Sequence, residues 1–318
     1  MTYPVKFTAT KNPDWFRIQW NLSNVCNYSC SYCPAHLHDG SIPRLPRDVV
    51  LSFCEFLVNE IQIKRNKKIG ILFTGGEVTQ VPYFPEILKY LSDNNCHITV
   101  HTNGSRTLNY WKRVAPYINQ MSISVHHESC DYTHLENLNT LVQEYDIAND
   151  YLFCIPPENF DAMWEKAYYF VNNVTPCVYI KPLRKDFGPE WYDYTDEQWD
   201  LIKNTDFEYA GSMPPPRGTW STSMKHDVLW STGETTVKTS SEIQNANLHH
   251  WKGWYCNIGK EQLIIDFDGN VYGGQCKVGG TLFNVYDNFK VIPDQPTICT
   301  QNTCDCRADM LIKKYRGN

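Results

Sequence analysis

The chain has 318 residues and a formal net charge of −6, with 29 Lys and Arg against 35 Asp and Glu. This length fits one large domain or a large domain with a small one, and no clustered Lys/Arg face points to nucleic acid. No apolar run is long enough to cross a membrane, and residues 1–14 lack the pattern of a signal peptide. We therefore expect a cytoplasmic protein without a membrane or nucleic-acid partner.

The thirteen cysteines are unevenly distributed. An odd number in a chain expected to be cytoplasmic argues against a disulfide framework. Three lie between residues 26 and 33, and five lie between residues 256 and 306. The other five stand alone and are expected to be small buried hydrophobic residues: Cys54, Cys96, Cys130, Cys154 and Cys177.

Residues 16–182 alternate between short apolar runs and helical spacing. Strands are predicted at 16–20, 69–74, 97–101, 121–125, 151–155 and 177–181. Helices are predicted at 49–63, 83–91, 108–118, 135–145 and 159–171. This alternation predicts an α/β fold with a parallel sheet, and six units are too few for a closed eight-stranded barrel. We expect a partial (β/α)6 barrel whose chemistry gathers at the carboxyl ends of its strands.

The pattern changes after Leu183. A helix is predicted at 196–203, whereas 207–255 is rich in Pro, Gly, Ser, Thr and Trp and shows no convincing periodicity. A β-hairpin is predicted at 261–272, and a cysteine-rich loop with a short helix ends the chain. The expected domains are a barrel at 1–183, a connecting segment at 184–253 and a small cysteine-rich domain at 254–318.

Cys26, Cys30 and Cys33 follow the first predicted strand with the spacing CxxxCxxC. Thiolates are the usual protein ligands of iron–sulfur clusters, and three of them leave one iron of a four-iron cluster open to another ligand. A zinc loop completed by His36 or His38 is the alternative. The spacing, with Tyr32 before the third cysteine, resembles the signature of the radical S-adenosylmethionine (SAM) superfamily.

This resemblance implies a [4Fe–4S] cluster whose open iron binds the amino and carboxylate groups of SAM. An electron from the cluster then cleaves SAM to a 5′-deoxyadenosyl radical, which abstracts a substrate hydrogen. The difficult chemistry belongs to the cofactor, while the protein supplies position and shielding. An electron donor such as flavodoxin or ferredoxin is the implied partner.

Further motifs stand at the ends of later strands. Gly75-Gly76-Glu77, after Thr74, resembles the family motif that binds the SAM amino group, although Val78 replaces the usual Pro. Thr102-Asn103-Gly104 resembles another family turn, Ser124 matches a position that often contacts SAM, and His126 stands where many relatives carry Asp. The implied SAM-binding residues are Tyr32, Thr74, Gly75, Gly76, Glu77, Thr102, Asn103, Ser124 and His126.

Three more residues are candidates for the substrate side. Lys181 and Arg184 follow the sixth strand, where relatives often border the substrate, and a solvated strand end is the alternative. Cys154, at the end of the fifth strand, could donate a hydrogen atom to a product radical. The simpler interpretation of Cys154 is a buried hydrophobic residue.

Cys256 precedes the predicted hairpin and Cys276 follows it, and Cys299, Cys304 and Cys306 come later. This order resembles the C-terminal extension of radical SAM proteins called SPASM, or its shorter form, twitch. The five cysteines fit one auxiliary [4Fe–4S] cluster, with Cys256 and Cys276 completed by two or three of the others. Zinc is the alternative.

The leading functional hypothesis is a net oxidation or crosslink of a ribosomally made peptide through the auxiliary cluster. It rests on analogy with short relatives of this kind. A radical dehydrogenase or rearrangement enzyme acting on a sugar, cyclitol or nucleoside is the first alternative. A zinc-binding interaction protein without catalytic activity is the second.

Overall fold

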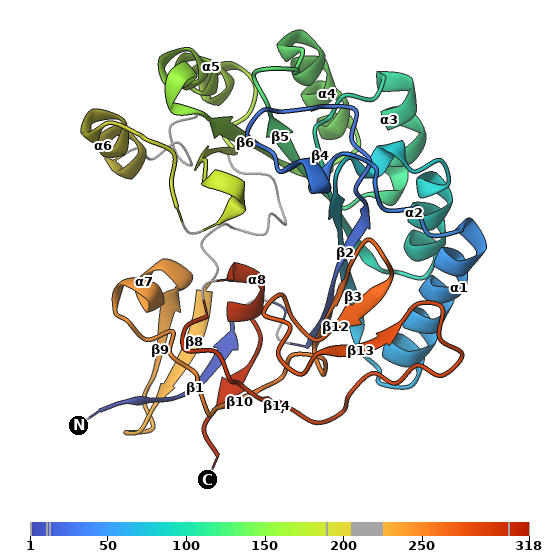
Figure 1. Cartoon of the computed structure of the whole chain (residues 1–318), viewed down its shortest axis with the longest axis vertical. Helices are drawn as coiled ribbons and strands as arrows, with labels where there is room; N and C mark the ends of the chain where they lie inside the picture. The colour runs from blue at the N-terminus through green and yellow to red at the C-terminus, as the bar shows by residue number, and fades with distance from the viewer. Residues whose placement is uncertain are drawn as a thin grey trace.

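The computed structural model describes residues 2–10, 12, 14–188, 190–204, 225–304 and 306–317. Two sheets organise these residues (Figure 1). The larger has nine strands in the order β13-β12-β11-β2-β3-β4-β5-β6-β7, and the smaller has six in the order β14-β10-β15-β1-β8-β9. No described helix is both long and apolar enough to cross a bilayer.

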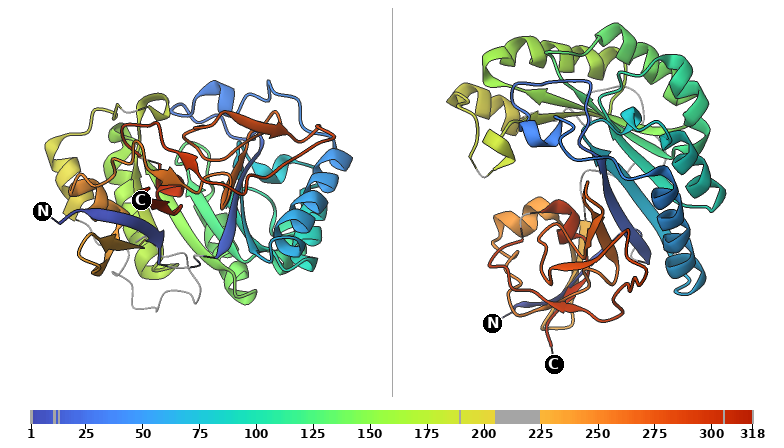
Figure 2. Two further views of the ribbon diagram at one scale, coloured as in Figure 1. Left: turned by 90° about the horizontal axis from the view of Figure 1, so that it is seen from below. Right: turned by 45° about the vertical axis from the view of Figure 1, so that its right-hand side comes forward.

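Six parallel strands form the main part of the larger sheet, and the predicted α/β alternation is confirmed. The strands are β2 (Trp15–Ser23), β3 (Lys68–Gly75), β4 (His97–Thr102), β5 (Gln120–Val125), β6 (Ala148–Ile155) and β7 (Val178–Pro182). The helices along their outer side are α1 (Arg47–Leu57), α2 (Phe84–Asp93), α3 (Leu108–Val114), α4 (Tyr132–Glu144) and α5 (Phe160–Asn173) (Figure 2). Among the described strands the sheet does not close, because β13 and β7 are its two edges.

The two faces of the larger sheet differ in polarity. Successive side chains of a strand point to opposite faces, so one alternating set packs beneath the helices. That set includes Trp20, Phe73 and Ile123 and belongs to the main apolar core. The other set faces away from the helices and includes the buried residues Arg17, Gln120 and Cys154. Most of this set is only partly buried or exposed: Gln19, Leu72, Thr74, His101, Ser122, Ser124, Asp150, Leu152 and Lys181. This inner face is therefore the polar side of the sheet.

Regular elements stand in two segments where none was predicted. The first predicted strand, at 16–20, is confirmed as part of β2, but β1 (Pro4–Ala9) precedes it and was not predicted. Within the segment expected to be irregular, β8 (Lys225–Trp230), β9 (Thr235–Thr239) and α7 (Ser240–Asn245) form regular structure. The reason is that β1 pairs with β8, more than two hundred residues away, so the pairing partner is invisible to a local pattern (Figure 1).

The last part of the chain contributes to both sheets. β11 (Gln262–Ile265) pairs in parallel with β2 and antiparallel with β12 (Asn270–Tyr272), which in turn pairs with β13 (Thr281–Asn284). In contrast, β10 (Tyr255–Cys256), β14 (Thr297–Ile298) and β15 (Lys314–Tyr315) belong to the smaller sheet. Each sheet thus contains strands from before residue 183 and from after residue 253. The remaining helices are α6 (Asp196–Asn204) and α8 (Arg307–Met310).

Candidate active site and second cysteine group

The first cysteine loop follows β2 and is anchored to the ends of neighbouring strands. Asn27 Nδ2 donates to Ser105 Oγ at 2.9 Å, beyond the end of β4. Beyond β5, the carboxylate of Glu128 accepts from the backbone N of Ser31 at 2.8 Å and from its Oγ at 2.5 Å. The tyrosine of the loop, Tyr32, lies 2.7 Å through its hydroxyl from His126 Nδ1. The loop is therefore held over the carboxyl edge of the sheet.

The thiols of this loop lie in a partly apolar environment. Cys30 packs with Tyr32, Cys154 and Leu183, and Cys33 lies against the same group. Burial, together with charge on the neighbouring thiols, raises the pKa of Cys30 to about 12 and that of Cys33 to about 11. Such thiols ionise readily only beside a cationic centre, so this donor set fits an iron–sulfur cluster.

The two glycines after Thr74 allow the end of β3 to lie directly against the start of the cysteine loop. A Cβ at Gly75 would lie 2.5 Å from the carbonyl oxygen of Ser23, and one at Gly76 would lie 2.6 Å from that of Val25. Gly76 N donates to Ser23 O at 2.8 Å. Any larger residue at either position would force these segments apart.

Glu77 is fully buried and joins the ends of two strands. Its carboxylate accepts from Thr79 N at 3.1 Å, from Thr102 Oγ1 at 2.8 Å and from Asn103 N at 2.7 Å. Burial raises the pKa of Glu77, while these hydrogen bonds lower it. The side chain of Asn103 continues the connection, donating to Asn27 Oδ1 at 3.1 Å. Glu77 thus positions the turn that faces the cysteine loop, and its contact with SAM stays a prediction.

Lys181 lies near the cysteine loop, at the end of β7. Burial raises the pKa of Cys33 and Cys154, and the charge of Lys181 offsets part of this rise. Burial lowers the pKa of His126, and the charge of Lys181 lowers it further. Cys154 is 3% exposed beside Cys30. Arg184 is differently placed, because its guanidinium lies 4.0 Å from the centroid of the Trp191 ring. The structure therefore brings Lys181 and Cys154 to the loop and engages Arg184 with an aromatic ring.

Two features of this site were missed by the sequence reasoning. Glu128 anchors the cysteine loop, yet an acidic residue in an exposed loop gives no signal of that role. The pair of Ser122 and Asp150 lies on the inner face, with Ser122 Oγ donating to Asp150 Oδ1 at 2.6 Å. Burial raises the pKa of Asp150 to about 6. The inward alternation of β5 and β6 is the signal that could have found this pair.

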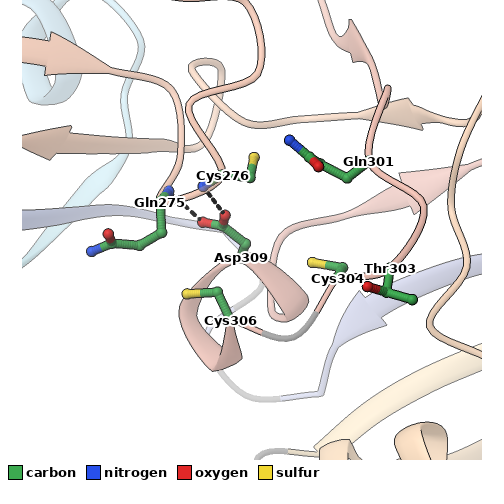
Figure 3. A pocket seen from close by; sticks show the side chains of 7 residues that line it. All are labelled: Gln275, Cys276, Gln301, Thr303, Cys304, Cys306 and Asp309. Carbon is green, nitrogen blue, oxygen red and sulfur yellow. Dashed lines mark hydrogen bonds between the residues drawn. The ribbon is translucent and has the colours of Figure 1, made fainter. Parts of the chain in front are cut away.

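Three cysteines of the second group line one open pocket of about 260 Å³ (Figure 3). Its lining residues are Gln275, Cys276, Gln301, Thr303, Cys304, Cys306 and Asp309. Cys256 is 3% exposed and lies near enough for its charge to raise the pKa of Cys276 and Cys304, both about 12 chiefly through burial. Cys299 does not line the pocket and packs with Trp251, Trp254 and Met310. Cys256 does not line the pocket either. Cys299 lies near enough to Cys256 for its charge to raise the pKa of that thiol, and Cys304 packs against the same apolar cluster as Cys299.

Asp309 lines this pocket and holds neighbouring segments together through its carboxylate. It is 1% exposed, and its carboxylate accepts from Gln275 N at 3.0 Å, Cys276 N at 2.8 Å and Gln262 Nε2 at 2.7 Å. The four thiols are a donor set that fits an iron–sulfur cluster or zinc. Within the described ranges, no three Cys, His, Asp or Glu side chains already form a compact metal cage at either site.

Residues 20–146 match the family model of the Radical SAM superfamily. The chain therefore contains a radical SAM domain, which implies a [4Fe–4S] cluster and SAM as its cofactors. The matched range includes the cysteine loop, the Gly-Gly-Glu turn and His126. A comparison with curated protein sequences finds no match.

Solved structures with a similar fold include proteins bound to S-adenosylmethionine or to a peptide. The structure described as native anSMEcpe with bound AdoMet and Cp18Cys peptide has a TM-score of 0.54 at 16% identity, covering 86% of this chain and 78% of anSMEcpe. Streptococcus suis SuiB bound to S-adenosylmethionine has a TM-score of 0.53 at 12% identity, covering 86% of this chain and 64% of SuiB. SuiB bound to precursor peptide SuiA has a TM-score of 0.51 at 12% identity, covering 83% and 60%. The chain thus spans less than two thirds of SuiB, and the likeness concerns the fold.

Proposed function

We propose that this chain is a radical SAM enzyme that oxidises or crosslinks a ribosomally made peptide. Cys26, Cys30 and Cys33 would hold the cluster that binds SAM. A single auxiliary [4Fe–4S] cluster would occupy the pocket of the second cysteine group. The observation that carries the proposal is the position of the cysteine loop over the carboxyl edge of the sheet, beside Lys181 and Cys154.

The inner face of the sheet supports a polar, extended substrate. Gln19, His101, Ser122 and Asp150 supply hydrogen-bonding groups along strands that end below the cysteine loop. A peptide presents a donor and an acceptor at most of its residues, which matches such a surface. The peptides named with anSMEcpe and SuiB agree with this choice by analogy of fold.

When bound, the two clusters would supply reductive cleavage of SAM to a 5′-deoxyadenosyl radical and acceptance of an electron during substrate oxidation. The residues of the chain fix geometry and charge. Glu77 and Glu128 hold the turns around the cysteine loop through the hydrogen bonds described above. Lys181 places a cation beside the substrate face, where it would orient a peptide carbonyl or carboxylate.

The cofactor content tests the metal part of the proposal. Anaerobically purified protein should contain about eight irons per chain, as expected for two four-iron clusters, with negligible zinc. Formation of 5′-deoxyadenosine should disappear in Cys30→Ala and persist in Cys306→Ala, which is the matched variant at the second site. Iron near four would contradict the auxiliary cluster, and zinc in place of iron would instead favour the interaction protein.

The substrate class is tested with the peptide encoded by any short reading frame beside the gene. Incubation with SAM and a reductant should remove two hydrogens from the peptide, as measured by mass spectrometry, and Cys30→Ala should leave its mass unchanged. If the neighbouring genes instead encode sugar or nucleotide enzymes and only their small product is modified, the peptide assignment is wrong.

A further inference from the structure

Lys314 is a buried cation beneath the second cysteine group. It lies on β15, is 1% exposed, and donates through Nζ to the carbonyl oxygens of Asp309 and, at 3.0 Å, Ile312. The ammonium group also lies 4.5 Å from the centroid of the Trp251 ring. These contacts hold the charge in one place between α8 and the smaller sheet.

No described carboxylate forms an ion pair with Lys314. Asp309 offers its backbone carbonyl to Lys314, while its carboxylate accepts from the N–H groups of Gln275, Cys276 and Gln262. A buried ammonium is costly unless negative charge lies nearby. Carbonyl dipoles reduce this cost but supply no net charge.

The thiols of the second cysteine group can supply the missing negative charge. Cys256 on β10 is the pairing partner of Lys314 on β15. Cys304 packs against the apolar cluster that contains Trp251, the ring that Lys314 contacts. An iron–sulfur cluster with four thiolates is anionic in both of its common oxidation states, and one added electron makes it more so. The net charge around a cluster is one of the factors that set its reduction potential.

We propose that Lys314 is the buried counter-charge of the auxiliary cluster and raises its reduction potential. This inference rests on the proposed cluster at Cys256, Cys276, Cys304 and Cys306. A fixed cation stabilises the reduced, more negative form more than the oxidised form. Lys314 would therefore make the cluster a better acceptor of an electron during substrate oxidation, while touching neither substrate nor SAM.

The chain contains a matched control beside Lys314. Lys313 is the preceding residue and is only half-buried. Its Nζ lies 5.5 Å from the centroid of the Tyr315 ring, whereas Lys314 contacts Trp251. Loss of charge at Lys313 changes the overall charge of the protein equally, but it leaves the buried cation in place.

The test is a potentiometric titration of the anaerobic holoenzyme, followed by electron paramagnetic resonance of the second cluster. Lys314→Gln removes the charge and keeps N–H donors for the carbonyls, and we expect at least a tenfold loss in the one-electron reduction equilibrium, a fall of about 59 mV. Lys314→Arg and Lys313→Gln should retain the wild-type potential. An unchanged potential in Lys314→Gln with full iron content would overturn the proposal.

Iron content separates the remaining outcomes. If wild-type protein contains only the first cluster, both the auxiliary cluster and the role of Lys314 are refuted. An intact second cluster with an unchanged potential refutes the role of Lys314 alone. If Lys314→Gln loses the second cluster, Lys314→Arg decides the matter: retained iron supports the counter-charge, and lost iron shows that Lys314 acts only by packing.

Discussion

The hydroxyl of Tyr32 lies 2.7 Å from Nδ1 of His126, and their rings stack with centroids 5.9 Å apart. This pair joins the cysteine loop to the segment after β5. Burial, and secondly the charge of Lys181, lowers the pKa of His126 to about 4, so the ring is neutral near pH 7 and can accept a hydrogen bond. His126 therefore contacts the cysteine loop through the hydroxyl of Tyr32.

The variant His126→Phe keeps an aromatic ring but removes the hydrogen-bond acceptor. Because a buried hydroxyl without a partner costs about 1–3 kcal/mol, we expect 5′-deoxyadenosine formation at subsaturating SAM to fall roughly tenfold at pH 7.5. The measurement is product formation against SAM concentration, with His127→Phe as the neighbouring control. Wild-type kinetics in His126→Phe would show that this contact does not position the loop.

Glu128 anchors the same loop through Ser31. In Glu128→Gln one carboxylate oxygen becomes an NH2 group, so one of the two hydrogen bonds from Ser31 loses its acceptor. The other hydrogen bond is weaker because the acceptor is no longer charged. We expect iron of the first cluster to be removed by a chelator several-fold faster under anaerobic conditions. Glu144→Gln, at the exposed end of α4, is the control. Equal rates in the two variants would contradict the anchoring role.

Cys299 should be dispensable for metal binding. It is 8% exposed among Trp251, Trp254 and Met310 and does not line the pocket. Cys299→Ala should therefore retain the iron of the second cluster, whereas Cys276→Ala should lose it. Iron analysis of the two proteins, prepared in parallel, distinguishes them. Equal iron loss would place Cys299 among the ligands.

We expect His226 to contribute to the stability of the folded protein in a way that is lost in acid. It is fully buried, its Nε2 lies 2.9 Å from Ser240 Oγ, and burial followed by the charges of Lys314 and Arg17 lowers its pKa to about 4. In the unfolded chain His ionises near 6.5, so the unfolded state binds the proton first. The contribution of neutral His226 to the free energy of unfolding is therefore complete above pH 6.5 and is lost as the pH falls towards 4.

We therefore expect the unfolding temperature of the wild type to fall between pH 6.5 and 4. The part due to His226 corresponds to a loss of about 3 kcal/mol in the free energy of unfolding. His226→Gln should show a smaller fall over the same window, because that side chain does not titrate. His250→Gln, at an exposed position, should behave as wild type. The measurement is thermal unfolding followed by circular dichroism, and parallel curves for His226→Gln and wild type would rule out this contribution.

The parallel sheet could be predicted because its strands and helices carry local periodic patterns. β3 and β5 lie within one residue of their predicted bounds at each end. β1 and β8 could not be predicted, since each is short and is stabilised by the other across more than two hundred residues. The joining of β11 to β2 was missed for the same reason, because parallel pairing between distant strands depends on the whole chain.

The sequence by itself determined the chemical groups: the cysteine spacing, the Gly-Gly-Glu turn and the second set of cysteines. Their types and spacings are local, so they can be identified without a fold. Only the tertiary structure decided which groups meet, because contacts between strand ends depend on sheet order. It placed Glu128 against Ser31, brought Cys276, Cys304 and Cys306 to one pocket and buried Lys314 opposite Cys256. These are long-range relationships of charge and burial, which no short segment of sequence encodes.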